Sequence, residues 1–479
     1  ERRTSLTDVM WRLMNEEGMR RAELIQSDGY AEFVTTLWDE ARALDASRPI
    51  VENDFIGLRH ELVRSDIRTP HWYGRATREF LHALDGRLDR LDREEGPVYV
   101  TEFGEWGLPA ADGAGAFWDQ QDDLRALVGE SSWPGTFDEL VEGTQAHQGW
   151  ADRVQGERLR TSPHVRGFCV TEWTDVPHEL NGLVSLRRTP KQPAIDGFRT
   201  AAADVAPIAT LARYSYAVGE TVTVQLFVSN WSPVALSAGR LRVALEDADE
   251  WLEVPRIPAG DVVAVGAVAL GTTKAGPCRL SVRLESAGAD TEVGYPIHLV
   301  EPAAPRVVEV RGSAALADGL AAAGWTVTAE AGATLVIGER TLDADGATAL
   351  EAELGAGRRA VVLAQDVVPV LGAASPLNPH WGPTPYAFTD GALATLGAAR
   401  VLQAELFHCG ADAHLAEVEG GVGVLVPPPT GTWGALVAGS QAGAGALVAC
   451  QLRIESGCAE GYGFDLAVLS ELVGRVEEL

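Results

Sequence analysis

One stretch decides the fold of the amino-terminal part of this chain: Pro97-Val98-Tyr99-Val100-Thr101-Glu102-Phe103-Gly104-Glu105-Trp106-Gly107. Its β-branched and aromatic residues predict a strand, and the glycines that follow predict that the strand ends in a turn. Glu102 would then stand at the carboxyl end of a strand, which is where α/β barrels carry their catalytic groups. A carboxylate at this place can also cap the next helix or pair with an arginine, so the stretch alone leaves a catalytic and a structural role open.

The segments around this strand alternate between strand-like and helix-like patterns, which is typical of parallel βα units. Strands are predicted over 9–14, 49–52 and 165–173, another is predicted to end at 70–74, and helices are predicted over 28–44, 75–93 and 137–156. In the first of these helices the apolar period predicts one apolar face, made of Phe33, Leu37, Ala41 and Leu44.

Two further regions differ in pattern from the first. Alternation with period two predicts an immunoglobulin-like β-sandwich without its disulfide over residues 205–301. After the proline-rich linker 301–305, alternating strands and helices predict an open α/β domain over residues 302–479, and this domain resembles flavodoxin-like or amidotransferase-like modules. No nucleotide-binding loop follows the first strand of this domain, so we expect a structural role or a part in homo-oligomer assembly.

Composition excludes several classes of partner. The chain has 68 acidic and 39 basic residues, and its net charge of -29 would repel the phosphates of nucleic acid. No apolar run reaches the roughly 18 residues of a membrane helix, and the first residues lack the apolar core of a secretory signal. The number and spacing of the 5 cysteines match neither a disulfide framework nor a zinc cluster, which favours a cytoplasmic over a secreted protein. If the protein begins further upstream, any leader peptide would lie outside this sequence.

A second carboxylate stands at a predicted strand end. Glu16 follows Asn15 in the run Trp11-Arg12-Leu13-Met14-Asn15-Glu16. A retaining glycosidase needs two such carboxyl groups, one as nucleophile and one as acid and then base, about 5 to 5.5 Å apart. The pair Glu16 and Glu102 therefore predicts glycoside hydrolysis.

These residues resemble motifs of glycoside hydrolase family 2, the family of β-galactosidases, β-glucuronidases and β-mannosidases. The run that ends in Asn15-Glu16 is similar to its W-x-x-x-N-E signature on the fourth barrel strand, His71-Trp72-Tyr73 to its sixth-strand H-x-Y element, and Thr101-Glu102-Phe103-Gly104 to its nucleophile motif. The segment 167–191, with Glu172-Trp173, resembles the eighth strand and its exit. The resemblance implies that residues 1–204 are the carboxyl-terminal part of a catalytic TIM barrel, strands 4–8.

The resemblance also implies a role for each matching residue. Glu16 would be the acid/base and Glu102 the nucleophile, while Asn15 would bind the sugar 2-hydroxyl. Tyr73 would hydrogen-bond the nucleophile and keep it ionised, His71 would bind substrate, and Trp173 would form an apolar platform under the sugar ring. No cofactor is expected. A divalent cation assists some family members, but its ligands are not identifiable in this sequence.

Alternatives stay open for several of these residues. Glu17 lies beside Glu16 and could be the inward-pointing one, and Glu105 and Glu172 compete with Glu102 for the nucleophile's role. His71 and Trp72 could both be core residues. β-Glucuronidases of the family bind the sugar carboxylate through an N-x-K pair, which Asn181-Gly182-Leu183 lacks, so a β-galactoside or another neutral β-glycoside is the expected substrate.

Family members carry further domains and three barrel strands ahead of the region that this sequence matches. We therefore expect an amino-terminal segment or subunit to complete the barrel. The rival hypothesis is a catalytically silent carbohydrate-binding or scaffold chain that complements such a segment. A scaffold has no need for the full set of Asn15, Glu16, Tyr73, Glu102 and Trp173, which favours the enzyme.

Overall fold

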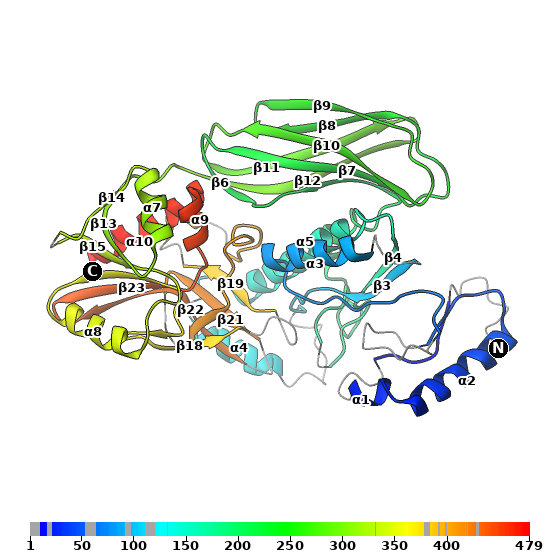
Figure 1. Cartoon of the computed structure of the whole chain (residues 1–479), viewed down its shortest axis with the longest axis horizontal. Helices are drawn as coiled ribbons and strands as arrows, with labels where there is room; N and C mark the ends of the chain where they lie inside the picture. Colours follow the sequence, from blue (N-terminus) through cyan, green and yellow to red (C-terminus); the bar gives the residue numbers. More distant parts are fainter. Residues whose placement is uncertain are drawn as a thin grey trace.

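The structure is a computed structural model, and it describes most of the chain (Figure 1). The described residues are 10–16, 22–52, 64–91, 97–110, 120–131, 133–177, 179–330, 332–377, 384–390, 393–397, 400–416, 418, 420–427 and 431–479. Glu17, the competitor of Glu16, lies outside these residues. No helix in the described ranges is both long and apolar enough to cross a membrane.

Parallel strand segments in the amino-terminal part form an open arc. β1 (Trp11–Arg12) pairs in parallel with β2 (Ile50–Val51), and β3 (Val98–Phe103) pairs in parallel with β4 (Val165–Val170). The segment 66–72 lies between the two pairs, because the Asp66 amide donates to Ile50 and parallel bridges join this segment to β3. The arc does not close among the described residues, so the predicted half-barrel is confirmed. Its numbering as family strands 4–8 stays a prediction.

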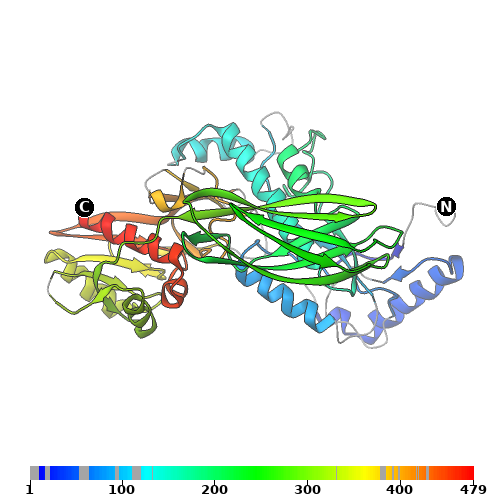
Figure 2. The same cartoon turned by 90° about the horizontal axis from the view of Figure 1, so that it is seen from above.

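Helices follow these strands as a βα pattern requires. They are α1 (Ala22–Ile25), α2 (Asp28–Leu44), α3 (Arg78–Leu91), α4 (Gln120–Glu130), α5 (Phe137–Leu159) and α6 (Gln192–Phe198). α5 starts at a capping box in which the Thr136 and Glu139 side chains each bond the other's backbone amide. Most of α5 is buried, because it lies between the arc and the sandwich (Figures 1 and 2).

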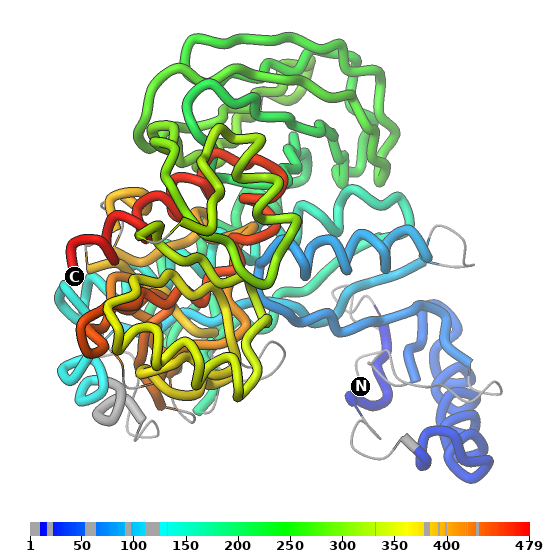
Figure 3. Tube along the Cα trace, turned by 60° about the vertical axis from the view of Figure 1, so that its left-hand side comes forward, coloured from blue at the N-terminus to red at the C-terminus, as the bar shows by residue number. Residues whose placement is uncertain are grey.

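The bounds predicted for α2 are confirmed, but its predicted apolar face is wrong. Ala31 and Val34 are buried, whereas Phe33 is 55% exposed and Leu44 is 68% exposed. The reason is the position of the helix: α2 stands at the edge of the molecule, away from the sandwich and from the carboxyl-terminal sheet (Figure 3). The arc is therefore packed against a different side of the helix from the one that hydrophobicity alone selects.

The middle of the chain is a two-sheet β-sandwich, as predicted. One sheet has the order β10-β7-β5 and the other β6-β12-β11-β8-β9. The strands are β5 (Val205–Thr210), β6 (Ser215–Ala217), β7 (Thr221–Asn230), β8 (Gly239–Leu245), β9 (Ala248–Val254), β10 (Asp261–Gly271), β11 (Gly276–Ser286) and β12 (Ala289–Val300). Alternate residues of β7 and β11 are buried, which is the period-two pattern that the sequence shows.

The last part of the chain contains one large mixed sheet. Its parallel half has the order β14-β13-β15-β16-β23, which is the 2-1-3-4-5 order of flavodoxin-like folds. These strands are β13 (Val307–Arg311), β14 (Thr326–Val327), β15 (Thr334–Ile337), β16 (Arg359–Leu363) and β23 (Gly445–Cys450). α8 (Ala344–Gly355) covers one face, and α7 (Ala314–Ala322) and α10 (Gly463–Glu478) cover the other, so the open α/β prediction holds for this half.

An antiparallel extension of this sheet was not predicted. It consists of β17 (Val367–Val368), β18 (Gly372–Pro376), β19 (Tyr386–Thr389), β20 (Ala413–Ala416), β21 (Val422–Val426) and β22 (Thr432–Ala442). A short helical turn, η1 (Ala394–Leu396), and α9 (Glu455–Glu460) complete the described elements. β21 and residues 434–438 of β22 are buried and apolar, so their period does not distinguish them from parallel strands, whereas β18 is largely exposed.

The three parts share cores. One apolar cluster includes Trp72 and Val154 of the half-barrel, Val222 of the sandwich and Phe407 of the last part. A second joins the half-barrel to β19 and β21 of the carboxyl-terminal sheet. Because these cores cross the predicted limits, the division into domains 1–204, 205–301 and 302–479 stays a prediction.

Candidate active site

Glu102 lies near the carboxyl end of β3. Val98, Val100 and Phe103 are buried, whereas Glu102 is partly exposed. The turn that follows requires a glycine, since Gly104 has a φ of +148° and a Cβ there would lie 2.8 Å from the Thr171 carbonyl oxygen. The glycine after Glu102 therefore allows β3 and the end of β4 to approach closely.

Glu16 reaches the same place from the end of β1. Its φ of 54° is in the left-handed region, which is uncommon for a residue other than glycine. Its side chain is 22% exposed and that of Glu102 is 19% exposed, so both carboxylates remain open to solvent. Asn15, directly before it, is exposed.

His71 lies between the two carboxylates. Its Nδ1 is 2.6 Å from Glu16 Oε1 and 3.2 Å from Glu102 Oε2, and its side chain is only 2% exposed. The backbone holds the ring there, because His71 forms a parallel bridge with Glu102 and the Trp72 amide donates to the Glu102 carbonyl. Trp72 itself is 6% exposed and belongs to the core, as one of the open alternatives proposed.

Tyr73 completes the contacts of Glu102. Its hydroxyl donates a 2.8 Å hydrogen bond to Glu102 Oε2. Burial, followed by the charge of Glu102, raises the pKa of the Tyr73 phenol well above its ordinary value. Tyr73 is therefore a neutral donor, and a donor to a carboxylate stabilises its ionised form.

The spacing of these groups has a direct chemical meaning. A carboxylate oxygen of Glu16, one of Glu102 and a ring nitrogen of His71 all lie within 4.8 Å of one another. Carboxyl groups about 5 to 5.5 Å apart suit the double displacement of a retaining glycosidase, whereas inverting enzymes need about 6.5 to 9.5 Å. The three side chains are also of types that bind a divalent cation.

The end of β4 adds further acidic groups to the site. Burial, followed by the charges of Glu179, Asp175 and Glu102, raises the pKa of Glu172 to about 7. Trp173 is next in the chain and is 65% exposed, as a sugar platform would be. Sequence reasoning treated Glu172 only as a rival nucleophile, and the signal for its position was its adjacency to Trp173.

Glu105 and Lys191 are both buried and make structural contacts. Glu105 is 2% exposed, accepts a 2.8 Å hydrogen bond from the Ala76 amide and is bonded by the Thr384 hydroxyl, so it joins the arc to the carboxyl-terminal sheet. The sequence alone did not predict a structural role for Lys191. Its buried ammonium donates to Asp175 Oδ1 at 2.7 Å and to the carbonyls of Gly107 and Leu180.

Comparisons with known proteins were made by sequence and by structure. No protein-family model matches the chain, and no curated protein matches it in sequence. Similar solved structures include an endo-β-1,4-mannanase from Thermotoga petrophila (14% identity, TM-score 0.29) and β-glucuronidase 3 from Bacteroides uniformis (13% identity, TM-score 0.30). A putative β-galactosidase from Bacteroides fragilis is also similar (12% identity, TM-score 0.27).

These likenesses are partial on both sides. They cover 62%, 63% and 61% of this chain, which spans 66%, 38% and 41% of the length of the three proteins in that order. All three are glycoside hydrolases by description, but at TM-scores of 0.27 to 0.30 the likenesses carry no argument. Membership of family 2 therefore stays a prediction, and the function is argued from the side chains.

Proposed function

We propose that this chain carries the catalytic residues of a retaining, exo-acting β-glycosidase. The observation that supports it most is the pair of partly exposed carboxylates, Glu16 and Glu102, with oxygens within 4.8 Å of each other and His71 between them. This is the arrangement that double displacement needs. A silent scaffold would have no use for two partly exposed carboxylates held this close, because their mutual repulsion costs stability.

In the proposed reaction Glu102 attacks the anomeric carbon while Glu16 donates its proton to the leaving oxygen. A covalent glycosyl ester on Glu102 results. Glu16, now ionised, takes a proton from water, and the hydroxide displaces the ester to release the sugar. Tyr73 stabilises the ionised nucleophile at the start and at the end of the cycle. The His71 Nδ1–H can donate to whichever of the two carboxylates carries the charge.

A neutral sugar fits the charges of this site. Glu179, Asp175 and Glu102 lie close enough to Glu172 to raise its pKa, so the region would repel a sugar carboxylate. Lys191, which bonds Asp175, is buried and so is not available to a sugar carboxylate. We therefore propose a β-galactoside or another neutral β-glycoside rather than a glucuronide as substrate.

Covalent trapping tests the proposal. Activated 2-deoxy-2-fluoro-β-glycosides with the galacto, gluco and manno configurations would be incubated with the chain, alone and together with an amino-terminal segment that completes the barrel. We expect the intact mass to rise by one sugar and peptide mapping to place it on Glu102. Glu102→Gln should not be labelled, whereas Glu40→Gln, on the exposed side of α2, should be labelled like the wild type. A label on Glu16 or Glu172 would contradict the assignment.

The acid/base role of Glu16 has its own signature. Glu16→Ala should lose about 10²- to 10⁴-fold in turnover of substrates with poor leaving groups. Aryl glycosides whose leaving group needs no proton should lose much less in the first step. An equal loss for both kinds of substrate would remove Glu16 from this role.

A further inference from the structure

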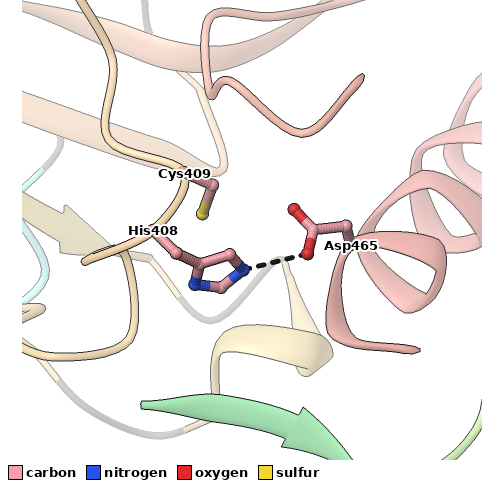
Figure 4. A group of neighbouring side chains, drawn as sticks. All are labelled: His408, Cys409 and Asp465. Carbon is pink, nitrogen blue, oxygen red and sulfur yellow. Dashed lines mark hydrogen bonds and ion pairs between the residues drawn. The ribbon is translucent and has the colours of Figure 1, made fainter. Parts of the chain in front are cut away.

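A second cluster of reactive side chains lies in the carboxyl-terminal part, away from the half-barrel carboxylates. His408 and Cys409 come from the loop 401–411, and Asp465 comes from the first turn of α10 (Figure 4). One ligand atom of each residue lies within 4.8 Å of the other two. In Figure 4 the Cys409 sulfur points toward the space between the imidazole and the carboxylate. Imidazole, thiol and carboxylate therefore converge on one point.

The cluster is closed to solvent. The side chains of His408 and Asp465 are each 1% exposed, and Cys409 is fully buried. His408 Nε2 is 2.9 Å from Asp465 Oδ2, but Asp465 Oδ1 has no hydrogen-bond partner in the described part of the chain. A buried carboxylate with an oxygen unpaired is costly, since the usual penalty for such a group is a few kcal/mol. The missing partner points to a ligand.

We propose that His408, Cys409 and Asp465 form a structural zinc site. Zn²⁺ prefers imidazole nitrogen, thiolate sulfur and carboxylate oxygen, and these side chains would supply three of its four tetrahedral positions. With the usual bond lengths, ligand atoms around tetrahedral zinc are roughly 3.3 to 3.6 Å apart. The three atoms, already within 4.8 Å of one another, reach that spacing by small side-chain rotations.

The net charge of the cluster distinguishes a zinc site from a simple ion pair. A pair between protonated His408 and Asp465 would leave Cys409 without a function and Asp465 Oδ1 still unpaired. Zinc with a neutral imidazole, a thiolate and a carboxylate has no net charge, and it coordinates the oxygen that is otherwise unpaired. A buried group without net charge avoids most of the desolvation penalty of an isolated ion.

The position of the site gives it a structural task. The loop 401–411 touches all three parts of the molecule: the Arg78 amide of α3 donates to the Phe407 carbonyl, and the Ser215 hydroxyl donates to the Glu405 carbonyl. The Phe407 ring also packs against Trp150 of α5 at 6.1 Å between centroids. A metal that fastens this loop to α10 would therefore stabilise the junction of the half-barrel, the sandwich and the last sheet.

The test uses the whole chain, produced in minimal medium with either Zn²⁺ or Co²⁺ so that the metal enters during folding. We expect about one equivalent of tightly held zinc per chain by elemental analysis. The cobalt form should show a thiolate-to-cobalt charge-transfer band. Cys409→Ala should lose the band and the bound metal, and Asp465→Asn should hold less zinc. Chelator present during heating should lower the unfolding midpoint of the wild type by about 3 °C or more and leave that of Cys409→Ala unchanged.

Two controls make the result specific. Cys278→Ser changes a thiol of the sandwich strand β11, outside the cluster, and should keep both the metal and the band. Glu102→Gln removes one carboxylate from the Glu16, His71 and Glu102 group and should also keep them. The cobalt spectrum of the wild-type protein tests the zinc site even if a variant fails to fold. A wild-type protein without the thiolate band, or a metal content equal in wild type and Cys409→Ala, would overturn the proposal.

Discussion

The Tyr73 hydroxyl lies 2.8 Å from Glu102 Oε2 and donates a hydrogen bond to it across neighbouring strand segments of the arc. The same carboxylate is 3.2 Å from His71 Nδ1. Tyr73 therefore fixes the orientation of Glu102 by a hydrogen bond, and the His71 ring lies against the same carboxylate oxygen. In the proposed reaction this orientation decides how the nucleophile meets the anomeric carbon.

Removing the tyrosine donor should slow catalysis without unfolding the protein. A hydrogen bond to a charged group is worth about 1.5 to 3 kcal/mol, so Tyr73→Phe should lower kcat by about 10- to 100-fold. Burial raises the pKa of Tyr73, so the phenol stays protonated throughout the neutral and mildly alkaline range. The alkaline side of the pH–rate profile should therefore be the same in wild type and Tyr73→Phe. A changed alkaline limb would show that Tyr73 titrates during the reaction.

Loss of the exposed indole at the end of β4 should weaken sugar binding. Trp173→Ala removes a 65% exposed ring, so we expect little change in thermal stability and a rise in KM of roughly 5- to 10-fold. Trp251→Ala is the matched control, because Trp251 is 43% exposed on the sandwich, far along the chain from the site residues. If the two variants have the same KM, Trp173 is not a sugar platform.

Lys191 should matter for stability through its buried contacts. Lys191→Met removes the ammonium that donates to Asp175 and to two backbone carbonyls, and breaking such a buried pair typically costs about 3 to 5 kcal/mol. Denaturant unfolding at neutral pH measures this loss, and Lys274→Met, at an exposed position, should show none. A Lys191→Met variant with normal stability and altered sugar selectivity would instead make Lys191 a substrate ligand.

Glu105 should make stability depend on pH. Its ordinary pKa of 4.5 is raised to about 7 by burial, so the folded protein keeps this proton where the unfolded chain has lost it. The contribution of Glu105 to the free energy of unfolding therefore falls as pH rises from 4.5 to 7 and is constant above that. Glu105→Gln removes this dependence while keeping an acceptor for the Ala76 amide.

The variant should accordingly gain stability relative to wild type as the pH rises through that window. The gain is at most about 3.5 kcal/mol, since the pKa rises from 4.5 to about 7 and each pKa unit corresponds to about 1.4 kcal/mol. Unfolding curves at several pH values measure the difference. Glu40→Gln, an exposed change on α2, should show no such trend, and a flat difference for Glu105→Gln would mean that Glu105 is ionised inside the protein.

Local patterns in the sequence predicted most elements of the fold. The helical period placed α2 over its full length, and the glycine after Glu102 marked the end of β3, because only local sterics are involved there. Period-two alternation predicted the sandwich strands for the same reason. The family resemblance, rather than a local pattern, predicted that Tyr73 bonds Glu102, and the 2.8 Å hydrogen bond between them is present.

Other features were decided only by tertiary contacts. Which side of α2 is buried depends on where the arc lies, so Phe33 is exposed although it lies on the apolar stripe. The antiparallel extension of the last sheet could not be distinguished by period, because its central strands, such as β21, are buried and apolar on both faces. Lys191 is an ordinary lysine in the sequence, and its burial depends on Asp175 and on carbonyls from two other segments.

The sequence alone determined which residues could do chemistry, since residue type and strand position are local properties. Only the tertiary structure brought Glu16, His71 and Glu102 within 4.8 Å of one another, and it did the same for His408, Cys409 and Asp465. The physical reason is the same in both cases. Distances between residues far apart in the chain are set by the packing of the elements that carry them, and that packing is a property of the whole fold.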